Sequence, residues 1–243
     1  FLGSSTMIMQ SRKTLGKGLF IAIEGTDGSG KETQSKLVAK MLRKQKYPVT
    51  EFDFQRYAEP SAWFVTQYLN GAFGALKDIG AMEASLFFAL DRYAASKKIA
   101  AAVSNGRIIV SNRFVASNLA HQGSKFDDDA ERRAFISWAE ELEFKILQIP
   151  KPDCNIILFV TPAISQELVD QKKARVHLKG KKRDLHEQDI NHLTRTYDVY
   201  RELVKRNPKN YLPIECIENG KLLPIPVIFE RVWKEVARAI ATS

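Results

Sequence analysis

The chain has 243 residues, of which 44% are hydrophobic and 27% are charged, a composition that suits one globular α/β domain with a sizeable core. No apolar run reaches the roughly 18 residues that a membrane-spanning helix needs. The formal net charge of +9 is compatible with a nucleotide or a nucleic acid as partner, but the positive residues are spread along the chain, so charge alone does not choose between them.

The N-terminal segment, residues 1–17, is expected to be a disordered tag or extension, because its first six residues resemble the remnant of an expression tag. Residues 18–243 are expected to form a single domain. The two cysteines, Cys154 and Cys216, fall in apolar runs and lack metal-ligand spacing. They are therefore predicted to be buried, reduced thiols, which is consistent with a cytoplasmic protein.

A short apolar run at 19–24 predicts the first strand, and a turn with three glycines follows it. Gly25, Gly30 and Lys31 have the spacing of a P-loop, G-x-x-x-x-G-K. Backbone N–H groups in such a loop bind phosphate oxygens, helped by the positive end of the helix that follows. The sequence therefore predicts a nucleotide-binding site at this turn.

One position departs from that pattern. The residue after Lys31 is Glu32, where a P-loop usually has the serine or threonine whose hydroxyl ligates Mg²⁺, and Thr33 lies one step late. A carboxylate at this place leaves the metal ligation of the loop open.

The remaining strands and helices alternate along the chain. Apolar runs predict strands at 49–54, 108–110, 154–160 and 211–217. Helical patterns are predicted at 31–45, 61–69, 83–104, 115–121, 127–144, 163–173, 186–204 and 226–240. This alternation predicts βαβ units and a three-layer α/β/α fold of the P-loop NTPase type with a five-stranded parallel sheet. Right-handed crossovers then place the loops after the first three strands at one edge of the sheet.

Four segments, in order, resemble the motifs of the thymidylate kinases in the P-loop nucleoside-monophosphate kinase class. The P-loop has the form G-x-D-x-x-G-K with Asp27, and residues 54–57, Phe-Gln-Arg-Tyr, are similar to the F-P-R-Y loop of that family with glutamine in place of proline. Residues 86–92 are similar to its L-x-F-A-x-D-R helix, and residues 112–118 to its D-R-Y-x-x-S motif. Each motif alone is weak, whereas the ordered set is specific.

The resemblance implies the reaction ATP + dTMP → ADP + dTDP with Mg²⁺ as cofactor. It implies ATP contacts at Gly25, Asp27, Gly28, Ser29, Gly30, Lys31, Glu32, Thr33, Arg175 and Arg183. It implies dTMP contacts at Asp27, Arg56, Phe88, Arg92, Arg113, Ser117, Asn118 and His121. The residues expected to be catalytic are Lys31, Arg56, Arg113 and Arg183.

The resemblance also implies individual roles at the acceptor. Asp27 would bind the 3′-hydroxyl of dTMP, Arg56 would hold its 5′-phosphate, and Arg113 would bridge the acceptor and donor phosphates. Phe88 would stack on thymine, and Arg92, one turn later on the same helix face, would reach the base edge. Ser117 and Asn118 would also contact the base. His121 stands where some members have a tyrosine near the sugar.

A mobile lid is expected near residues 174–187, where the chain is most polar and basic. Some family members carry a basic residue inside the P-loop, and here Gly28 and Ser29 stand at the corresponding positions. The missing charge is therefore expected to come from the lid, with Arg183 the first choice and Arg175 and Lys182 the next.

Two departures from the family pattern occur together at the metal. Glu32 replaces the P-loop hydroxyl residue, and Asn112 replaces the acid that usually precedes the arginine of the fourth motif. One hypothesis is that Glu32 supplies the carboxylate that Asn112 lacks. The alternative is that Glu32 points away and that phosphates, water and Asn112 hold Mg²⁺.

Other functions stay open at the level of sequence: a kinase for dUMP or another nucleoside monophosphate, a deoxynucleoside kinase, or a P-loop regulator that binds nucleotide without turnover. The expected partners are small nucleotides, with neither nucleic acid nor membrane. The resemblance implies a homodimer, which is expected to form through the apolar faces of the helices around 87–103 and 135–147.

Overall fold

The computed structural model describes residues 15–75, 78–170 and 190–243. Its central sheet is parallel, with the strand order β2-β3-β1-β4-β5. The five strands are β1 (Leu19–Gly25), β2 (Val49–Asp53), β3 (Ile108–Asn112), β4 (Cys154–Phe159) and β5 (Tyr211–Glu215). The predicted five-stranded parallel sheet is therefore confirmed.

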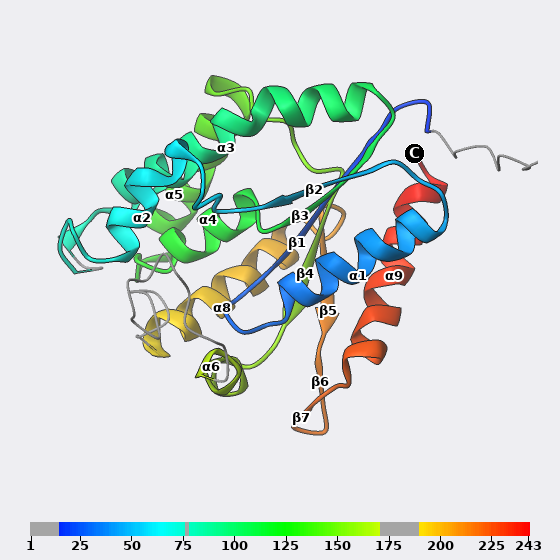
Figure 1. Cartoon of the computed structure of the whole chain (residues 1–243). Helices are drawn as coiled ribbons and strands as arrows, with labels where there is room; N and C mark the ends of the chain where they lie inside the picture. The colour runs from blue at the N-terminus through cyan, green and yellow to red at the C-terminus, as the bar shows by residue number, and fades with distance from the viewer. Residues whose placement is uncertain (1–14, 76–77, 171–189) are drawn as a thin grey trace, which may run out of the picture.

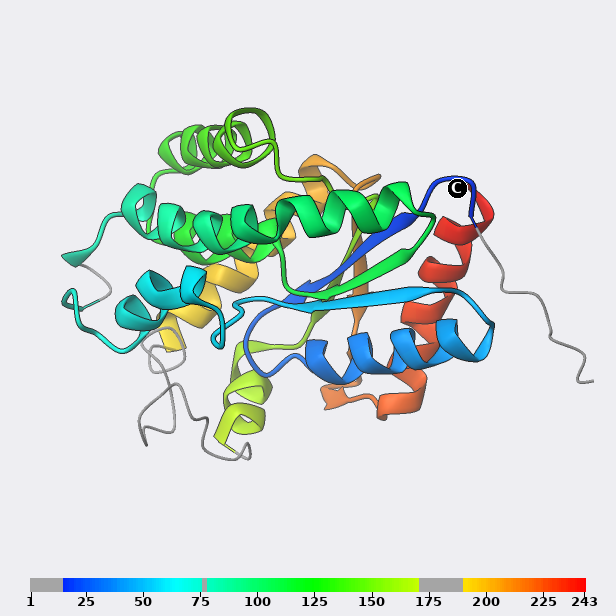
Figure 2. The same ribbon diagram turned by 45° about the horizontal axis from the view of Figure 1, so that its top comes forward.

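Helices cover both faces of this sheet, as Figures 1 and 2 show. The helices are α1 (Lys31–Lys44), α2 (Trp63–Leu69), α3 (Ala81–Ser104), α4 (Val115–Gly123), α5 (Asp129–Glu141), α6 (Pro162–Asp170), α8 (Ile190–Arg206) and α9 (Ile225–Ala241). A 3₁₀ turn, η1 (Pro60–Ala62), precedes α2, and a π-helical turn, η3 (Leu142–Ile146), follows α5. The helices α1 and α9 lie on one face, and α3, α4, α5 and α8 lie on the other. This arrangement is the predicted three-layer fold.

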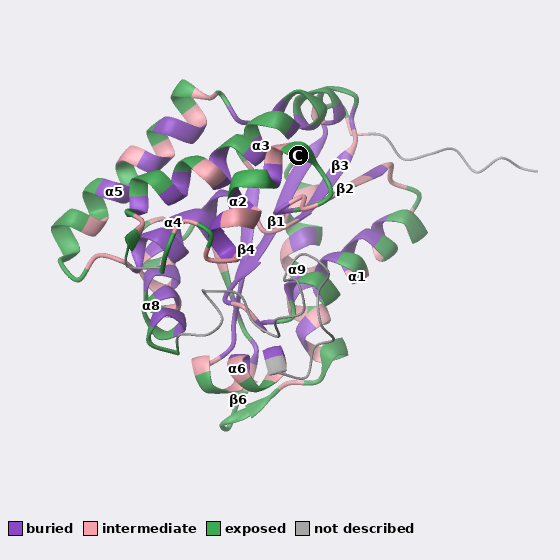
Figure 3. Cartoon of the chain, turned by 60° about the vertical axis from the view of Figure 1, so that its left-hand side comes forward, coloured by how far each residue is buried: buried purple, intermediate pink, exposed green. Residues whose placement is uncertain are grey.

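The central strand β1 is buried on both faces, which explains its unbroken apolar sequence. Ile21 and Ile23 belong to the core under α1 and α9, together with Val38 and Val232. The intervening Phe20 belongs to the core under α3, α4 and α8. In Figure 3 the strand β1 is accordingly purple, and the outer helix surfaces carry green.

The register of the sheet brings the expected site residues to one edge. Asp53 at the end of β2 pairs with Asn112 at the end of β3, and Asn112 pairs with Ile23, two residues before the end of β1. The loops after these three strands therefore leave the sheet side by side, as predicted. In an open α/β sheet, ligands bind beyond the carboxyl ends of the strands.

The structure differs from the sequence prediction at two segments. The last predicted strand ends at Glu215, and the chain forms a small hairpin of β6 (Ile217–Glu218) and β7 (Lys221–Leu222). The turn residues Asn219 and Gly220 have φ of 51° and 73°. The dipeptide Asn-Gly is a strong sequence signal for such a hairpin. The single helix predicted at 127–144 is α5 followed by η3.

The large apolar side chains of α3 lie on two sides of the helix. Ile99 is fully buried, whereas Leu86, Leu90 and Tyr93 are 40–50% exposed. Small side chains such as Ala84 and Ala95 instead line the buried side. Leu86, Leu90 and Tyr93 therefore form an outward stripe on α3, and Trp63 and Phe64 of α2 are exposed as well.

Both cysteines are buried and free, and burial raises the pKa of each thiol to about 12. The prediction of buried, reduced thiols is confirmed. Along the described part of the chain, no helix combines the length and the apolar character needed to cross a membrane.

Candidate active site

The P-loop connects the end of β1 to the first turn of α1. Gly25, Gly28 and Gly30 have φ of 138°, 81° and 84°, a region that residues with a Cβ rarely adopt. Gly30 is the N-cap of α1 and has no side chain to occupy the first-turn N–H groups, which suits an anion. The Lys31 side chain is nearly buried, and its Nζ donates to the carbonyl oxygen of Thr26 at 2.6 Å. The loop thus places backbone donors and a cation together.

Helix α6 packs closely against this loop. A Cβ at Gly28 would lie 2.2 Å from the carbonyl oxygen of Ser165, and the hydroxyls of Thr26 and Ser165 are 3.3 Å apart. The place where some family members carry a basic P-loop residue is therefore closed by backbone in this chain. This contact and the positive φ of Gly28 both favour glycine at this position.

Gly28→Ala is expected to destabilise the protein more than Gly30→Ala. Both positions have positive φ, which costs about 1–3 kcal/mol for a residue with a Cβ, but nothing lies within 4 Å of a Cβ at Gly30. The clash with Ser165 should destabilise Gly28→Ala by about 1–3 kcal/mol more. For a protein of this size, each kcal/mol lowers Tm by roughly 2–4 °C. Thermal melts of the two variants measure the difference, and equal Tm values would contradict the contact.

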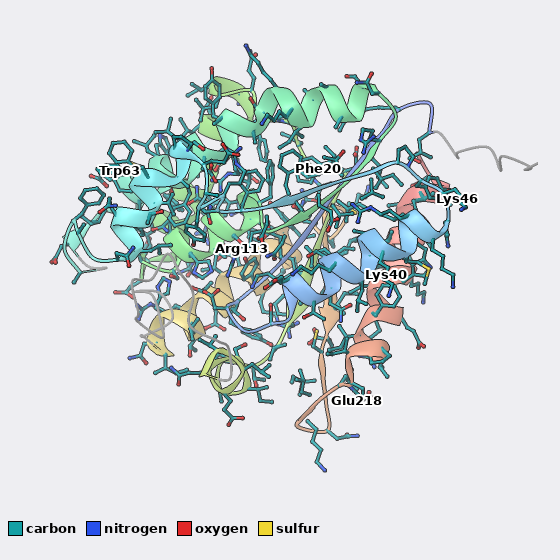
Figure 4. The ribbon with its side chains drawn as sticks, viewed as in Figure 1. Phe20, Lys40, Lys46, Trp63, Arg113 and Glu218 are labelled. Atoms are coloured by element: carbon teal, nitrogen blue, oxygen red, sulfur yellow. The ribbon has the colours of Figure 1, made fainter. Side chains whose placement is uncertain are left out.

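Arg113 lies at the centre of the site, where β1, α1 and α4 converge (Figure 4). It follows β3 with φ of 64°, and its backbone N–H donates to the carbonyl oxygen of Ile23 at 2.9 Å. Its guanidinium forms an ion pair with Asp27 and donates to Ser117 Oγ at 3.0 Å. Burial opposes the charged form, but the Asp27 carboxylate raises the pKa of Arg113 above its usual value. The guanidinium therefore stays charged beside the P-loop.

His121 lies on the same side of Arg113. Its Nε2 is 4.0 Å from Asp27 Oδ2 and 3.5 Å from Arg113 Nη1, and its Nδ1 is 3.3 Å from Nε2 of His192. The His192 ring continues to the hydroxyl of Ser124 at 3.1 Å. Burial lowers the pKa of His121 well below its usual value, so this imidazole is neutral at physiological pH. The structure places His121 beside Asp27 and Arg113, and its position near the sugar of the acceptor stays a prediction.

The buried carboxylate of Glu24 accepts hydrogen bonds from residues that surround Arg113. It accepts from the backbone N–H of Phe114 at 2.7 Å and from Ser117 Oγ at 2.6 Å, and the Tyr200 hydroxyl lies 3.5 Å away. Burial is the main reason why the pKa of Glu24 is raised. The Ser117 hydroxyl therefore belongs to the network around Arg113, and the predicted contact between Ser117 and the base stays a prediction.

Arg56 follows β2 and is held in one orientation by Asp91 of α3. The backbone N–H and Nε of Arg56 donate to the Asp91 carboxylate at 2.9 and 3.1 Å, and its Nη2 donates to Asp91 Oδ1 at 2.8 Å. Ser61 donates its hydroxyl to the same oxygen at 2.6 Å. Asp91 is fully buried, and the Arg56 side chain is 13% exposed. The arrangement leaves Arg56 charged and oriented at the edge of the sheet.

Asp91→Asn is expected to raise the KM for the acceptor about tenfold and to change kcat less, because Arg56 would lose its orienting carboxylate while keeping its charge. Steady-state kinetics with varied acceptor measure the split. Asp129→Asn is the matched control, since Asp129 is an exposed carboxylate that also pairs with an arginine, Arg132, on α5. A change in kcat alone would contradict a positioning role for Asp91.

A second buried ion pair lies farther along α3. Arg92 donates Nε to Glu143 Oε2 at 2.7 Å and pairs through Nη2 with Oε1, and both side chains are fully buried. Asn118 of α4 donates Nδ2 to the same Oε1 at 3.0 Å. Arg92 Nη1 and Asn118 Oδ1 are buried and have no hydrogen-bond partner among the described residues. Phe88, one turn before Arg92, is 8% exposed, and its predicted stacking on a base stays a prediction.

Comparison with known proteins agrees with this geometry. The family model described as thymidylate kinase matches residues 23–220. The thymidylate kinase of Mycobacterium tuberculosis is 33% identical over 186 residues, which cover 76% of this chain and 85% of that protein. The chain belongs to the thymidylate kinase family. A thymidylate kinase from Mycoplasma capricolum is 29% identical over 90% of this chain and 99% of that protein.

Solved structures of thymidylate kinases share the fold. The enzyme from Candida albicans aligns with a TM-score of 0.68 and 20% identity over 92% of this chain and 93% of that chain. The enzyme from Ehrlichia chaffeensis aligns with a TM-score of 0.62 and 22% identity over 90% of this chain and 99% of that chain. At these identities the likeness confirms the α/β kinase fold.

Mg²⁺ is implied by the ATP chemistry of the thymidylate kinase family, and oxygen atoms at the ends of β2 and β3 fit it. Asn112 donates Nδ2 to Asp53 Oδ1 at 2.7 Å. Its own Oδ1 is buried without a hydrogen-bond partner among the described residues. Carboxylate and amide oxygens are ligands that Mg²⁺ prefers. Asp53 is therefore a candidate that the sequence analysis missed, since it considered only Glu32 and Asn112.

Glu32 has a different environment. It is exposed in the first turn of α1, and its Oε1 lies 2.5 Å from Lys36 Nζ. Loss of hydration is the main cause that raises the pKa of Asp53, and the Glu32 carboxylate raises it further. Within the described ranges, no three His, Cys, Asp or Glu side chains form a group that could hold a metal by themselves. Phosphate and water oxygens would then complete the Mg²⁺ shell, and a metal role for Glu32 stays a prediction.

The predicted lid lies outside the described residues, with Arg175, Lys182 and Arg183. The site as described therefore brings together the P-loop, Asp27, Arg113 and His121, with Arg56 at the neighbouring strand end and Arg92 with Asn118 farther along the helices.

Proposed function

We propose that this chain transfers the γ-phosphoryl group of ATP to dTMP and forms ADP and dTDP. The observation that carries the proposal is the convergence of oriented cations on one sheet edge. Lys31 is the first residue of α1, Arg113 follows β3 and forms an ion pair with Asp27, and Arg56 follows β2 and pairs with the buried carboxylate of Asp91. Family membership and this arrangement together support a phosphate donor and a phosphate acceptor at one place.

The chemistry asks the protein mainly for position and charge. Two polyanionic phosphates repel, so cations must lie around and between them. Lys31 would act on the β- and γ-phosphates, and Arg56 and Arg113 would bind the acceptor through planar guanidinium groups that pair with phosphate oxygens. The attacking atom is already an anionic phosphate oxygen, so no residue has to act as general base. When bound, Mg²⁺ would neutralise charge on the donor phosphates.

Two buried polar atoms, one on Arg92 and one on Asn118, support thymine as the base of the acceptor. Thymine offers a carbonyl acceptor at O4 and a donor at N3–H. Arg92 has a donor, Nη1, and Asn118 an acceptor, Oδ1, that are both buried without a described partner. A buried donor or acceptor that lacks a partner costs about 1–3 kcal/mol, and a pyrimidine with a 4-keto group would satisfy both.

A coupled assay for ADP release tests the proposal with dTMP, dUMP, dCMP, dGMP, AMP and thymidine as acceptors. The expected result is turnover with dTMP, a lower rate with dUMP, and no turnover with thymidine, because Arg56 needs a phosphate to bind. Activity with dUMP above that with dTMP would favour the alternative acceptor. Binding of ATP and dTMP without any ADP release would favour a regulator.

A basic hollow on the described surface does not favour a nucleic-acid partner. It has a volume of about 800 Å³ and lies between α5, α8 and the segment before α5. Its arginines are neutralised in part, since Arg132 pairs with Glu202 and Asp129, and Arg201 pairs with Glu215. Ion-paired side chains offer little of the field that a phosphate backbone needs.

We also propose a homodimer, formed through the outward apolar stripe of α3 and α2 rather than through both helices expected from the sequence. Leu86, Leu90 and Tyr93 are exposed there, whereas Phe135 and Ile136 of α5 are buried in the core of the chain itself. Contiguous exposed apolar side chains of this kind mark interaction surfaces. Light scattering during gel filtration should give twice the mass of the chain. A cytoplasmic location, where ATP is present and thiols stay reduced, is part of the same proposal.

A further inference from the structure

Glu143 is a hub in the buried network beside the expected base site. Its Oε2 accepts from Arg92 Nε at 2.7 Å, and its Oε1 pairs with Arg92 Nη2 and accepts from Asn118 Nδ2 at 3.0 Å. The residue lies in the π-helical turn η3, a conformation that is rare and often found at functional sites. One carboxylate therefore connects α3, α4 and η3.

This carboxylate determines which way the Asn118 amide faces. Nδ2 lies 3.0 Å from Glu143 Oε1 and 3.4 Å from the carbonyl oxygen of Ser85. Both neighbours are acceptors, so the amide oxygen would be repelled if it took that place. Oδ1 is therefore turned away from Glu143, and it has no partner among the described residues.

The same carboxylate fixes the Arg92 guanidinium. Nε and Nη2 are both used by Glu143, and Nη1 is the nitrogen that has no partner in the described part of the chain. A bidentate fork of this kind fixes the plane of the guanidinium as well as its position. Glu143 thus presets one acceptor on Asn118 and one donor on Arg92.

We infer that Glu143 is a positioning residue that sets the selectivity of this kinase for a 4-keto pyrimidine over a 4-amino pyrimidine. The inference rests on the proposed function, in which Arg92 and Asn118 face the base. Thymine presents O4 as acceptor and N3–H as donor, and cytosine presents an N4 donor and an N3 acceptor. With cytosine, the N4 donor would face the Arg92 donor and the N3 acceptor would face the Asn118 oxygen. Asn118 could adapt only by turning its amide oxygen toward two acceptors, Glu143 and the carbonyl oxygen of Ser85.

A carboxylate is the side chain that performs this task. It offers acceptors on both oxygens, whereas an amide of the same shape offers one oxygen and two N–H donors. With Glu143→Gln, an NH₂ group replaces one of the two oxygens, so Arg92 or Asn118 loses an acceptor and is held less firmly in its orientation. The change should therefore act on base selectivity, which a purely structural ion pair would not affect.

The test compares kcat/KM for dTMP and dCMP in the wild-type protein, Glu143→Gln and Glu143→Asp. The expected result is that the dTMP/dCMP ratio falls at least about tenfold in Glu143→Gln, mainly through a higher KM for dTMP. Glu143→Asp keeps the negative charge beside Arg92 and therefore the fold, but it is one methylene too short to serve both partners. It should show a smaller fall of the ratio. Glu141→Gln, an exposed carboxylate of α5 paired with Lys145, is the matched control.

Two outcomes overturn parts of the reasoning separately. In the first outcome, the wild-type protein prefers dTMP, and the dTMP/dCMP ratio of both folded variants, Glu143→Asp and Glu143→Gln, stays within about twofold of the wild-type ratio. Glu143 then does not set selectivity, and the proposed function stands. If the wild-type protein itself shows no preference for dTMP over dCMP, the proposed function fails first. Should Glu143→Gln not fold, as removal of one buried charge can cause, the ratio measured for Glu143→Asp decides.

Discussion

Replacing Arg113 with methionine is expected to lower kcat with dTMP about a thousandfold, with a smaller change in KM. The guanidinium is held between the P-loop and α4 by Asp27, Ser117 and the carbonyl oxygen of Gly25. The residue also has positive φ, and its backbone is fixed to β1. A cation in this position would stabilise charge that develops between the two phosphates, which is where phosphoryl transfer needs it.

Arg113→Lys separates charge from geometry at the same position. Lysine keeps the positive charge but cannot pair with two oxygens in one plane, so kcat should still fall at least about tenfold. Arg107→Lys is the matched control, because Arg107 lies at the opposite end of β3 and donates to Thr50 and to the carbonyl oxygen of Val49. The assay is ADP release at saturating dTMP. A kcat for Arg113→Met within about threefold of the wild type would remove Arg113 from the reaction.

The P-loop and its strand could be predicted because their signals are local. Three glycines, a lysine and an apolar run before them lie within fifteen residues, and the required backbone conformations follow from the residue types. On the base side, Arg92 lay in a recognised motif, and its contact with the base stays a prediction. Asp91 lay in the same motif, but its pairing with Arg56 crosses 35 residues, and nothing in the spacing assigns that contact.

The buried position of Glu143 could not be predicted from the sequence. It stands among other acidic residues, Glu140 and Glu141, in an amphipathic helical pattern. Which of the three is buried depends on the π-helical turn that begins at Leu142 and shifts the helical register. The partner Arg92 lies 51 residues away. Periodicity gives no reason to select Glu143, and only the packing of α3 against η3 and α4 does so.

Asp53→Asn is expected to raise the Mg²⁺ concentration needed for half-maximal activity about 10–100-fold. Asn112 donates its amide Nδ2 to Asp53 Oδ1, and the register β2–β3 places the two residues side by side at the ligand edge. If the prediction holds, Asp53 on the neighbouring strand supplies the negative charge that Asn112 lacks.

The direct readout for Asp53 is nucleotide affinity rather than turnover. Calorimetry with ATP gives the ratio of Kd values without and with Mg²⁺, and this ratio should shrink in Asp53→Asn because the metal would lose an oxygen ligand or its water partner. Glu32→Gln is the informative comparison, since Glu32 already pairs with Lys36 on the exposed side of α1. If Glu32→Gln reduced the ratio of Kd values and Asp53→Asn did not, the carboxylate near Mg²⁺ would be Glu32 of the P-loop helix rather than Asp53 of β2. An effect of Asp53 alone would explain why glutamate is tolerated after the P-loop lysine: it would have no metal to bind.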